Sequence, residues 1–140
     1  MADRFRPILG EPLVCGGLAY AGHTGDWEHG LGDIDFLAPE AAFQQLLALC
    51  RDDASLRTEE TSYHTLKVSR GDLRVSIDSI EAYLSGIAYQ PIAMRVATFA
   101  FRAIDQLALA AAYRRAAETI PLKRAAYRRK LRGLTHSQRR

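Results

Sequence analysis

The chain contains few cysteines for a small domain. Among its 140 residues there are only two, Cys15 and Cys50, and they lie far apart without a CxxC pair. This spacing excludes the common CxxC type of zinc site, and it favours two reduced, buried thiols over a disulfide. We therefore expect the fold to depend on an ordinary hydrophobic core.

Long apolar runs are also missing. No stretch approaches the roughly 18 residues that span a bilayer, and the N-terminal MADRFRPILGEP has acidic residues and prolines where a signal peptide has an apolar segment. We expect a cytoplasmic protein with no membrane partner. The 48% hydrophobic and 25% charged residues are typical of globular proteins and indicate no particular activity.

Negative charge is absent from the C-terminal segment. Residues 119–140 hold 8 Lys or Arg and no acid, whereas all 16 Asp or Glu and the other 11 Lys or Arg precede them. Two interpretations stay open. The segment attracts RNA, phosphates or an acidic partner, or it is a solvated helix whose cations suit the negative C-terminal end of the helix dipole.

The periodic segments predict one α+β domain, residues 1–140, with a mixed sheet flanked by helices. We expect the sheet at about 12–80 and a helical part at about 81–134. The individual expectations are strands at 13–15 and 32–38, a helical turn from Gly16, a helix at 39–50, two strands within 63–80 joined by a turn at Gly71-Asp72, and helices at 92–117 and from Pro121 to about 131.

Two aspartates lie one residue apart in the predicted strand GDIDFLA. Ile34 and Phe36 face one side of this strand, so Asp33 and Asp35 share the other. Paired carboxylates on one strand repel each other, and a divalent cation such as Mg²⁺ removes that repulsion. A third carboxylate from a neighbouring strand commonly completes such a site, and Asp78 in LRVSIDSI has the matching alternation.

A glycine pair, Gly16-Gly17, ends the first predicted strand where a helix begins. Backbone N–H groups at such a junction can approach triphosphate oxygens, and the helix dipole favours an anion there. A triphosphate would also need cations, and the candidates are Lys67, Arg70, Arg74 and the C-terminal segment. Glu81 is a weaker candidate for a general base.

These motifs resemble the nucleotidyltransferase superfold. The Gly-Gly pair, the Asp-Ile-Asp that follows and a third aspartate in a later strand are most similar to the small lincosamide and aminoglycoside nucleotidyltransferases that modify antibiotics. The resemblance implies a small mixed sheet flanked by helices, catalytic and metal-binding roles for Asp33, Asp35 and Asp78, and a triphosphate loop at Gly16 and Gly17. Among the candidate cations, we expect Lys67 to bind the nucleotide.

The resemblance also implies a function. It is the Mg²⁺-dependent transfer of a nucleoside monophosphate, AMP from ATP or another NTP, to a hydroxyl of a small molecule such as an antibiotic, with release of pyrophosphate. Two alternatives stay open: a minimal nucleotidyltransferase of toxin–antitoxin type that modifies a protein partner or tRNA, and a non-catalytic binding module that retains the fold.

The predicted helix 92–117 has apolar residues around much of its circumference. They include Met94, Phe99, Phe101, Ile104, Leu107 and Leu109. Excess apolar surface is usually buried by a partner, and the resembling enzymes often complete the acceptor pocket across a dimer interface. We therefore predict a two-fold homodimer. The competing prediction is that the final helix covers this surface through Tyr127, Leu131 and Leu134.

Overall fold

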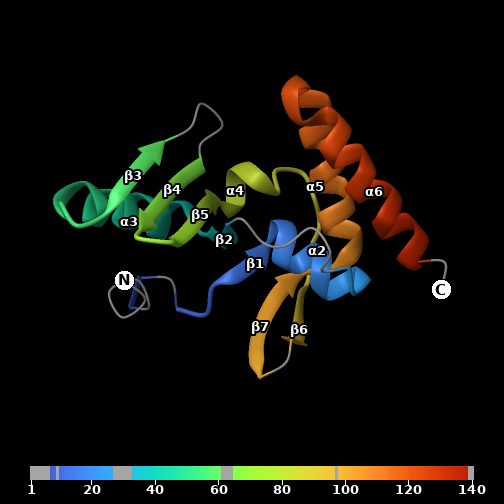
Figure 1. Cartoon of the computed structure of the whole chain (residues 1–140), viewed down its shortest axis with the longest axis horizontal. Helices are drawn as coiled ribbons and strands as arrows, with labels where there is room; N and C mark the ends of the chain where they lie inside the picture. Colours follow the sequence, from blue (N-terminus) through green and yellow to red (C-terminus); the bar gives the residue numbers. More distant parts are fainter. Residues whose placement is uncertain (1–6, 9, 27–32, 61–64, 97, 139–140) are drawn as a thin grey trace.

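The computed structural model describes residues 7–8, 10–26, 33–60, 65–96 and 98–138. Its strands and helices alternate in the first half and are grouped in the second (Figure 1). The elements, in chain order, are β1 (Leu13–Cys15), α2 (Gly16–Thr24), β2 (Ile34–Ala38), α3 (Glu40–Asp52), β3 (Arg57–Glu60), β4 (Thr65–Arg70), β5 (Leu73–Ser79), α4 (Ile80–Tyr83), β6 (Pro91–Val96), β7 (Phe99–Ile104), α5 (Gln106–Thr119), the 3₁₀ helix η1 (Pro121–Lys123) and α6 (Arg124–Gln138).

Within the described part of the chain, the strands form one mixed 7-stranded sheet in the order β3-β4-β5-β2-β1-β7-β6. β2 runs parallel to β5 and β1 runs parallel to β7, while the other neighbours are antiparallel. The predicted hairpin is confirmed, because Arg70 pairs with Leu73 across Gly71-Asp72 and Gly71 has a φ of 59°. The predicted α+β class with a mixed sheet is therefore confirmed.

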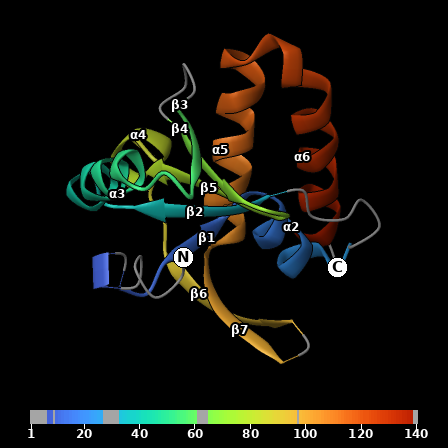
Figure 2. The same cartoon turned by 60° about the vertical axis from the view of Figure 1, so that its left-hand side comes forward.

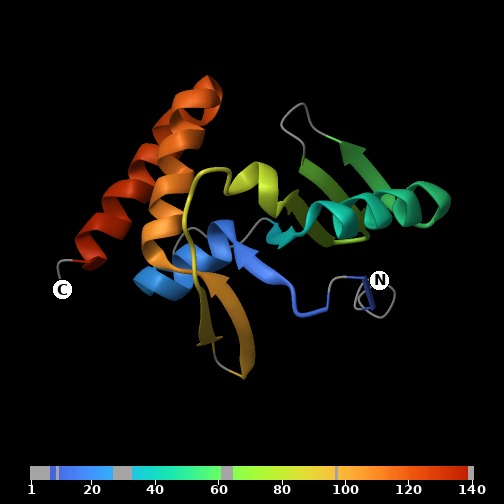
Figure 3. The ribbon, with the colours of Figure 1, turned by 180° about the vertical axis from the view of Figure 1, so that it is seen from behind.

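One hydrophobic cluster lies between α3 and the β2-β4-β5 part of the sheet. The ribbon in Figure 3 shows α3 beside these strands. The apolar stripe predicted for this helix is the stripe that is buried, comprising Phe43, Leu46, Leu47 and Cys50. The helix starts one residue after Pro39, as its spacing predicts. Both cysteines are free and buried, as expected.

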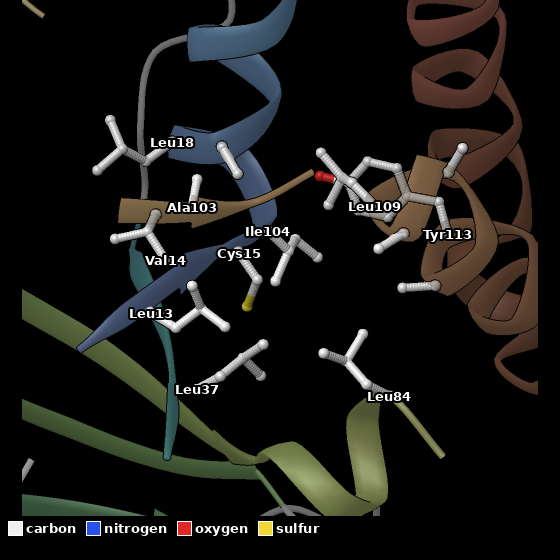
Figure 4. Close-up of a cluster of buried hydrophobic side chains, with 14 of the residues drawn as sticks. Leu13, Val14, Cys15, Leu18, Leu37, Leu84, Ala103, Ile104, Leu109 and Tyr113 are labelled. Atoms are coloured by element: carbon white, nitrogen blue, oxygen red, sulfur yellow. The ribbon is translucent and has the colours of Figure 1, made fainter. Parts of the chain in front are cut away.

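A second cluster joins β1 and β7 to α2, α5 and α6. Figure 4 shows Leu109 and Tyr113 of α5 reaching toward Cys15 and Ile104. α5 and α6 lie side by side at one end of the sheet (Figure 2). Leu134 of α6 is fully buried against this cluster, and Tyr127 and Leu131 pack on it.

The prediction of a single helix over 92–117 is wrong. Residues 91–96 and 99–104 form the hairpin β6–β7, and the helix α5 begins only at Gln106, where the Asp105 side chain accepts a hydrogen bond from the N–H of Ala108. Alanine-rich composition favours a helix locally, but β7 gains hydrogen bonds by pairing with β1 in the sheet. The predicted helical part 81–134 thus contains two strands of the sheet.

The last helix begins near Pro121, as predicted, but it continues beyond residue 131 to Gln138. No helix in the described residues is long and apolar enough to cross a membrane.

Candidate active site

Asp33, Asp35 and Asp78 lie on one face of the sheet, as their alternation predicts. β2 and β5 are neighbours, with Asp35 opposite Ser76 and Leu37 opposite Asp78. Residues opposite one another in a parallel pair share a face, and the Ser76 hydroxyl donates to Asp33 Oδ2 at 3.2 Å. The apolar side chains of the opposite face pack on α3.

The start of α2 holds the carboxylate of Asp35. The N–H of Gly17 donates a hydrogen bond to it, so the carboxylate lies at the positive N-terminal end of the helix. Gly16 has a φ of 63°, and a Cβ there would lie 2.7 Å from Asp35 Cγ. Glycine at position 16 is therefore required by the close approach of Asp35, whatever else binds at this helix end.

Asp78 is the second carboxylate of the site. Thr65, its partner on β4, donates a hydrogen bond from Oγ1 to Asp78 Oδ1 at 2.5 Å. Burial, followed by the negative charge of Asp78, raises the pKa of Asp35 to about 6, despite the hydrogen bond from Gly17. Burial also raises the pKa of Asp78, against the hydrogen bond from Thr65 and the positive charges of Lys123 and Lys67. The two carboxylates therefore form an electrostatically unfavourable pair.

A cavity of about 540 Å³ opens on the aspartate face of β3, β4 and β5. Its charged lining residues are Asp33, Arg57, Glu59, Lys67 and Arg74. Lys67 and Arg74, two of the cations expected to serve a triphosphate, therefore lie beside Asp33. Arg70 lies on β4 three residues after Lys67, so the strand alternation places it on the opposite face.

The C-terminal helices approach the carboxylates from another direction. Lys130 Nζ lies 5.4 Å from the centre of the Tyr113 ring, and its positive charge lowers the pKa of Asp35. Burial lowers the pKa of Lys130 itself, while the charge of Asp35 raises it. The positive charge of Lys123 lowers the pKa of Asp78. In sequence, Lys130 is 95 positions from Asp35, and Lys123 is 45 positions from Asp78.

The sequence contained a signal for Lys130 that we did not use. Lys130 follows Tyr127 by three residues and precedes Leu134 by four, so it belongs to the apolar stripe that α6 turns inward. A single lysine within such a stripe indicates a specific polar partner inside the molecule. Arg57 of the cavity carried no comparable signal, because β3 is exposed along its length.

Glu81 is occupied by a structural role. Its Oε2 accepts hydrogen bonds from the N–H of Glu40 at 2.8 Å and from the Ser79 hydroxyl at 3.1 Å. It therefore holds the start of α3 against the end of β5, which leaves it a poor general base.

The described residues contain no group of three or more His, Cys, Asp or Glu side chains arranged to hold a metal ion. The charge of Asp78 raises the pKa of Asp35, and the charge of Asp33 adds a smaller effect in the same direction. A three-carboxylate metal site therefore stays a prediction.

This chain has the nucleotidyltransferase-like fold, a mixed sheet flanked by helices, with carboxylates clustered beside a glycine pair at a strand–helix junction. The fold is similar to that of solved structures. One is the crystal structure of ANT(2'')-Ia in complex with adenylyl-2''-tobramycin, at a TM-score of 0.64 and 21% identity, covering 98% of this chain and 83% of that chain. A solution structure of the antibiotic-resistance factor ANT(2'')-Ia has a TM-score of 0.66 and 20% identity over 98% and 78% of the two chains.

ANT(2'')-Ia is an aminoglycoside nucleotidyltransferase. The predicted resemblance of this chain to the antibiotic nucleotidyltransferases is thereby confirmed at the level of the fold. No family model matches the sequence, and no curated protein matches it.

Proposed function

We propose that residues 1–140 act as a single nucleotidyltransferase domain. The domain transfers a nucleoside monophosphate, AMP from ATP or another NTP, to a hydroxyl of a small acceptor such as an antibiotic. The observation that carries the proposal is the half-buried pair Asp35 and Asp78, held on neighbouring strands beside the start of α2 in a fold similar to that of ANT(2'')-Ia.

The carboxylate pair fits Mg²⁺. Burial and mutual repulsion raise the pKa of Asp35 to about 6, and a divalent cation favours the ionised form of both groups. Mg²⁺ is usually held by one or two carboxylates together with substrate phosphates. Asp35 and Asp78 would thus hold the ion, with Asp33 as the proposed third ligand. When bound, the ion would neutralise charge on the phosphates.

The remaining residues bind and orient the nucleotide. We assign Lys67, with Arg74 beside it in the cavity, to neutralising the triphosphate. Gly16 and Gly17 form the proposed triphosphate loop, but the N–H of Gly17 is already donated to Asp35. A phosphate bound at the start of α2 would therefore share this helix end with the Asp35 carboxylate. The acceptor hydroxyl then attacks the α-phosphorus, and pyrophosphate leaves.

Radiolabelled nucleotides test this proposal directly. Purified protein is incubated with each α-³²P-labelled NTP, with Mg²⁺ or with EDTA, and with a panel that includes tobramycin, a lincosamide, a protein lysate and tRNA. We expect a Mg²⁺-dependent labelled product with a small hydroxylated acceptor. Nucleotide binding without transfer to any acceptor would favour the non-catalytic module instead.

A homodimer stays part of the proposal, on a different basis from the sequence argument. Ile104 and Leu109 are fully buried within one chain, and α6 covers α5, as the competing prediction held. Support for a dimer now comes from β6, which is an edge strand whose Ile92 is 37% exposed. Edge strands with apolar side chains readily pair with a second copy.

A further inference from the structure

The outer face of α6 carries a row of arginines. Arg128, Arg129 and Arg132 are exposed, whereas Tyr127 and Leu131 of the same helix pack inward on the hydrophobic cluster. No ion pair involves these three arginines among the residues that the structure describes. The row therefore presents uncompensated positive charge to solvent.

The helix dipole does not account for this row. Cations stabilise the last turn of a helix, but the only basic residue there is His136. Arg128 instead lies in the first half of α6, whose first turn contains no acidic residue. A cation at that end of a helix opposes the dipole. A solvated helix whose cations suit the negative end of its dipole, one of the two interpretations of this segment, therefore does not explain most of these arginines.

The arginines also repel one another. Arg128 and Arg132 are four residues apart, which is the spacing at which like charges destabilise a helix. Four residues rise about 6 Å along the axis. The row is therefore a locally unfavourable concentration of positive charge that a polyanion would stabilise.

We infer that this arginine face of α6 binds the phosphate backbone of a nucleic acid. Arginine presents a planar fork of donors that matches phosphate oxygens, and a nucleic acid carries one negative charge at each nucleotide. The inference goes beyond the proposed transfer reaction and does not depend on it.

An anionic membrane is a poorer match for this face. A helix that lies on a bilayer buries large apolar side chains beside its cations, but the apolar side chains of α6 are directed into the core. The exposed Leu122 in η1, before the helix, is a single side chain. Charge complementarity without insertion therefore favours a nucleic acid.

Fluorescence anisotropy with labelled probes tests the inference. The probes are a short RNA strand, an RNA duplex and a DNA duplex of matched length, each titrated between about 50 and about 200 mM KCl. The variant Arg128→Gln/Arg129→Gln/Arg132→Gln is expected to bind roughly tenfold or more weakly, and the slope of log K against log salt is expected to fall by about 2 to 3. A preference for RNA over DNA duplex would indicate contacts to the 2′-hydroxyl.

A charge-matched control separates this face from net charge. Arg51→Gln/Arg95→Gln/Arg102→Gln removes three exposed arginines elsewhere and should leave affinity and salt slope nearly unchanged. Thermal unfolding is expected to show the α6 variant folded and no less stable than wild type, because repulsion is relieved. Undetectable binding at the lowest salt, equal loss in both triple variants, or equally tight binding of a poly-glutamate probe would overturn the inference.

Discussion

Asp35 combines three constraints in one side chain. It lies at the start of α2, it requires glycine at position 16, and it lies beside Asp78 in a half-buried setting that raises its pKa to about 6. A group held in an unfavourable ionised state costs stability in the free protein and becomes favourable when a cation binds. Stability and function are therefore expected to respond in opposite directions to its removal.

The first prediction concerns stability and pH. The pKa of Asp35 in the folded protein, about 6, lies above the ordinary aspartate value of 3.8, so the folded state binds the proton more tightly. Its contribution to stability is fully present below about pH 4 and is lost as the pH rises through about 6. In metal-free buffer, Asp35→Asn should therefore raise the free energy of unfolding near pH 8 by about 1 to 3 kcal/mol, with little change near pH 4.

Urea unfolding at both pH values measures this difference. Asp72→Asn is the control, because Asp72 is exposed in the hairpin turn; the same substitution there should have no comparable effect. If Asp35→Asn is equally or less stable than wild type near pH 8, the unfavourable carboxylate pair is not present in solution.

The second prediction concerns catalysis. Either Asp33→Asn or Asp35→Asn should cost about 4 kcal/mol of transition-state stabilisation, roughly a thousandfold in kcat/KM, because each removes a proposed metal ligand. The labelled-nucleotide assay measures it once an acceptor is found. Full activity of both variants would exclude the aspartates from the chemistry. If Asp33→Asn loses its fold together with its activity, the result for Asp35→Asn decides, because the stability of that variant is measured separately.

At the scale of elements, the site lies where unrelated parts of the chain meet. β2 and β5 supply the carboxylates, the β1–α2 junction supports one of them, and α6 adds Lys130 from above. Close packing of α6 on α2 is possible because Gly133 has no Cβ, which would otherwise lie 3.0 Å from the Tyr20 ring carbon Cζ. Gly16, at the contact of α2 with Asp35, and Gly133, at the contact of α6 with α2, therefore position these helices relative to the site.

The third prediction tests the β1–α2 junction. Gly16→Ala should destabilise the fold by about 2 to 4 kcal/mol, since it combines an unfavourable positive φ with a Cβ that collides with Asp35. Gly71→Ala is the matched control: its φ is 59°, but a Cβ there has nothing within 4 Å. The difference between the two variants in thermal unfolding measures the contact with Asp35. Equal losses would mean that backbone conformation alone requires Gly16.

At the scale of the whole molecule, charge and apolar surface are unevenly distributed. The C-terminal helices carry cations both toward the carboxylates and outward to solvent, and the edge strand β6 exposes Ile92. The proposed nucleotide site and the proposed dimer edge are separate features, so each can be tested without the other.

The fourth prediction is the oligomeric state. Light scattering should give a mass near twice the 15.6 kDa of one chain, and Ile92→Lys at the β6 edge should shift it toward the monomer. Leu73→Lys is the control, because Leu73 is also exposed, at 46%, but lies on the inner strand β5. A wild-type mass near 15.6 kDa across micromolar concentrations would leave the dimer without support.

The sequence by itself determined the local features of the site. Alternation placed Asp33 and Asp35 on one side of β2 and Asp78 on the corresponding side of β5, and the hairpin followed from Gly71-Asp72. The apolar stripe of α3 also followed from its spacing. These features depend on backbone periodicity and turn chemistry, which act over a few residues and are therefore legible in sequence.

Only the tertiary structure decided which of these features meet. The placement of β5 beside β2 makes Asp35 and Asp78 a pair, and the packing of α6 brings Lys130 to them from 95 positions along the chain from Asp35. The segment 91–104 is a hairpin because β7 pairs with β1, a contact that outweighs its local preference for helix. Long-range pairing and burial set these outcomes, since their free energy depends on neighbours that no local pattern specifies.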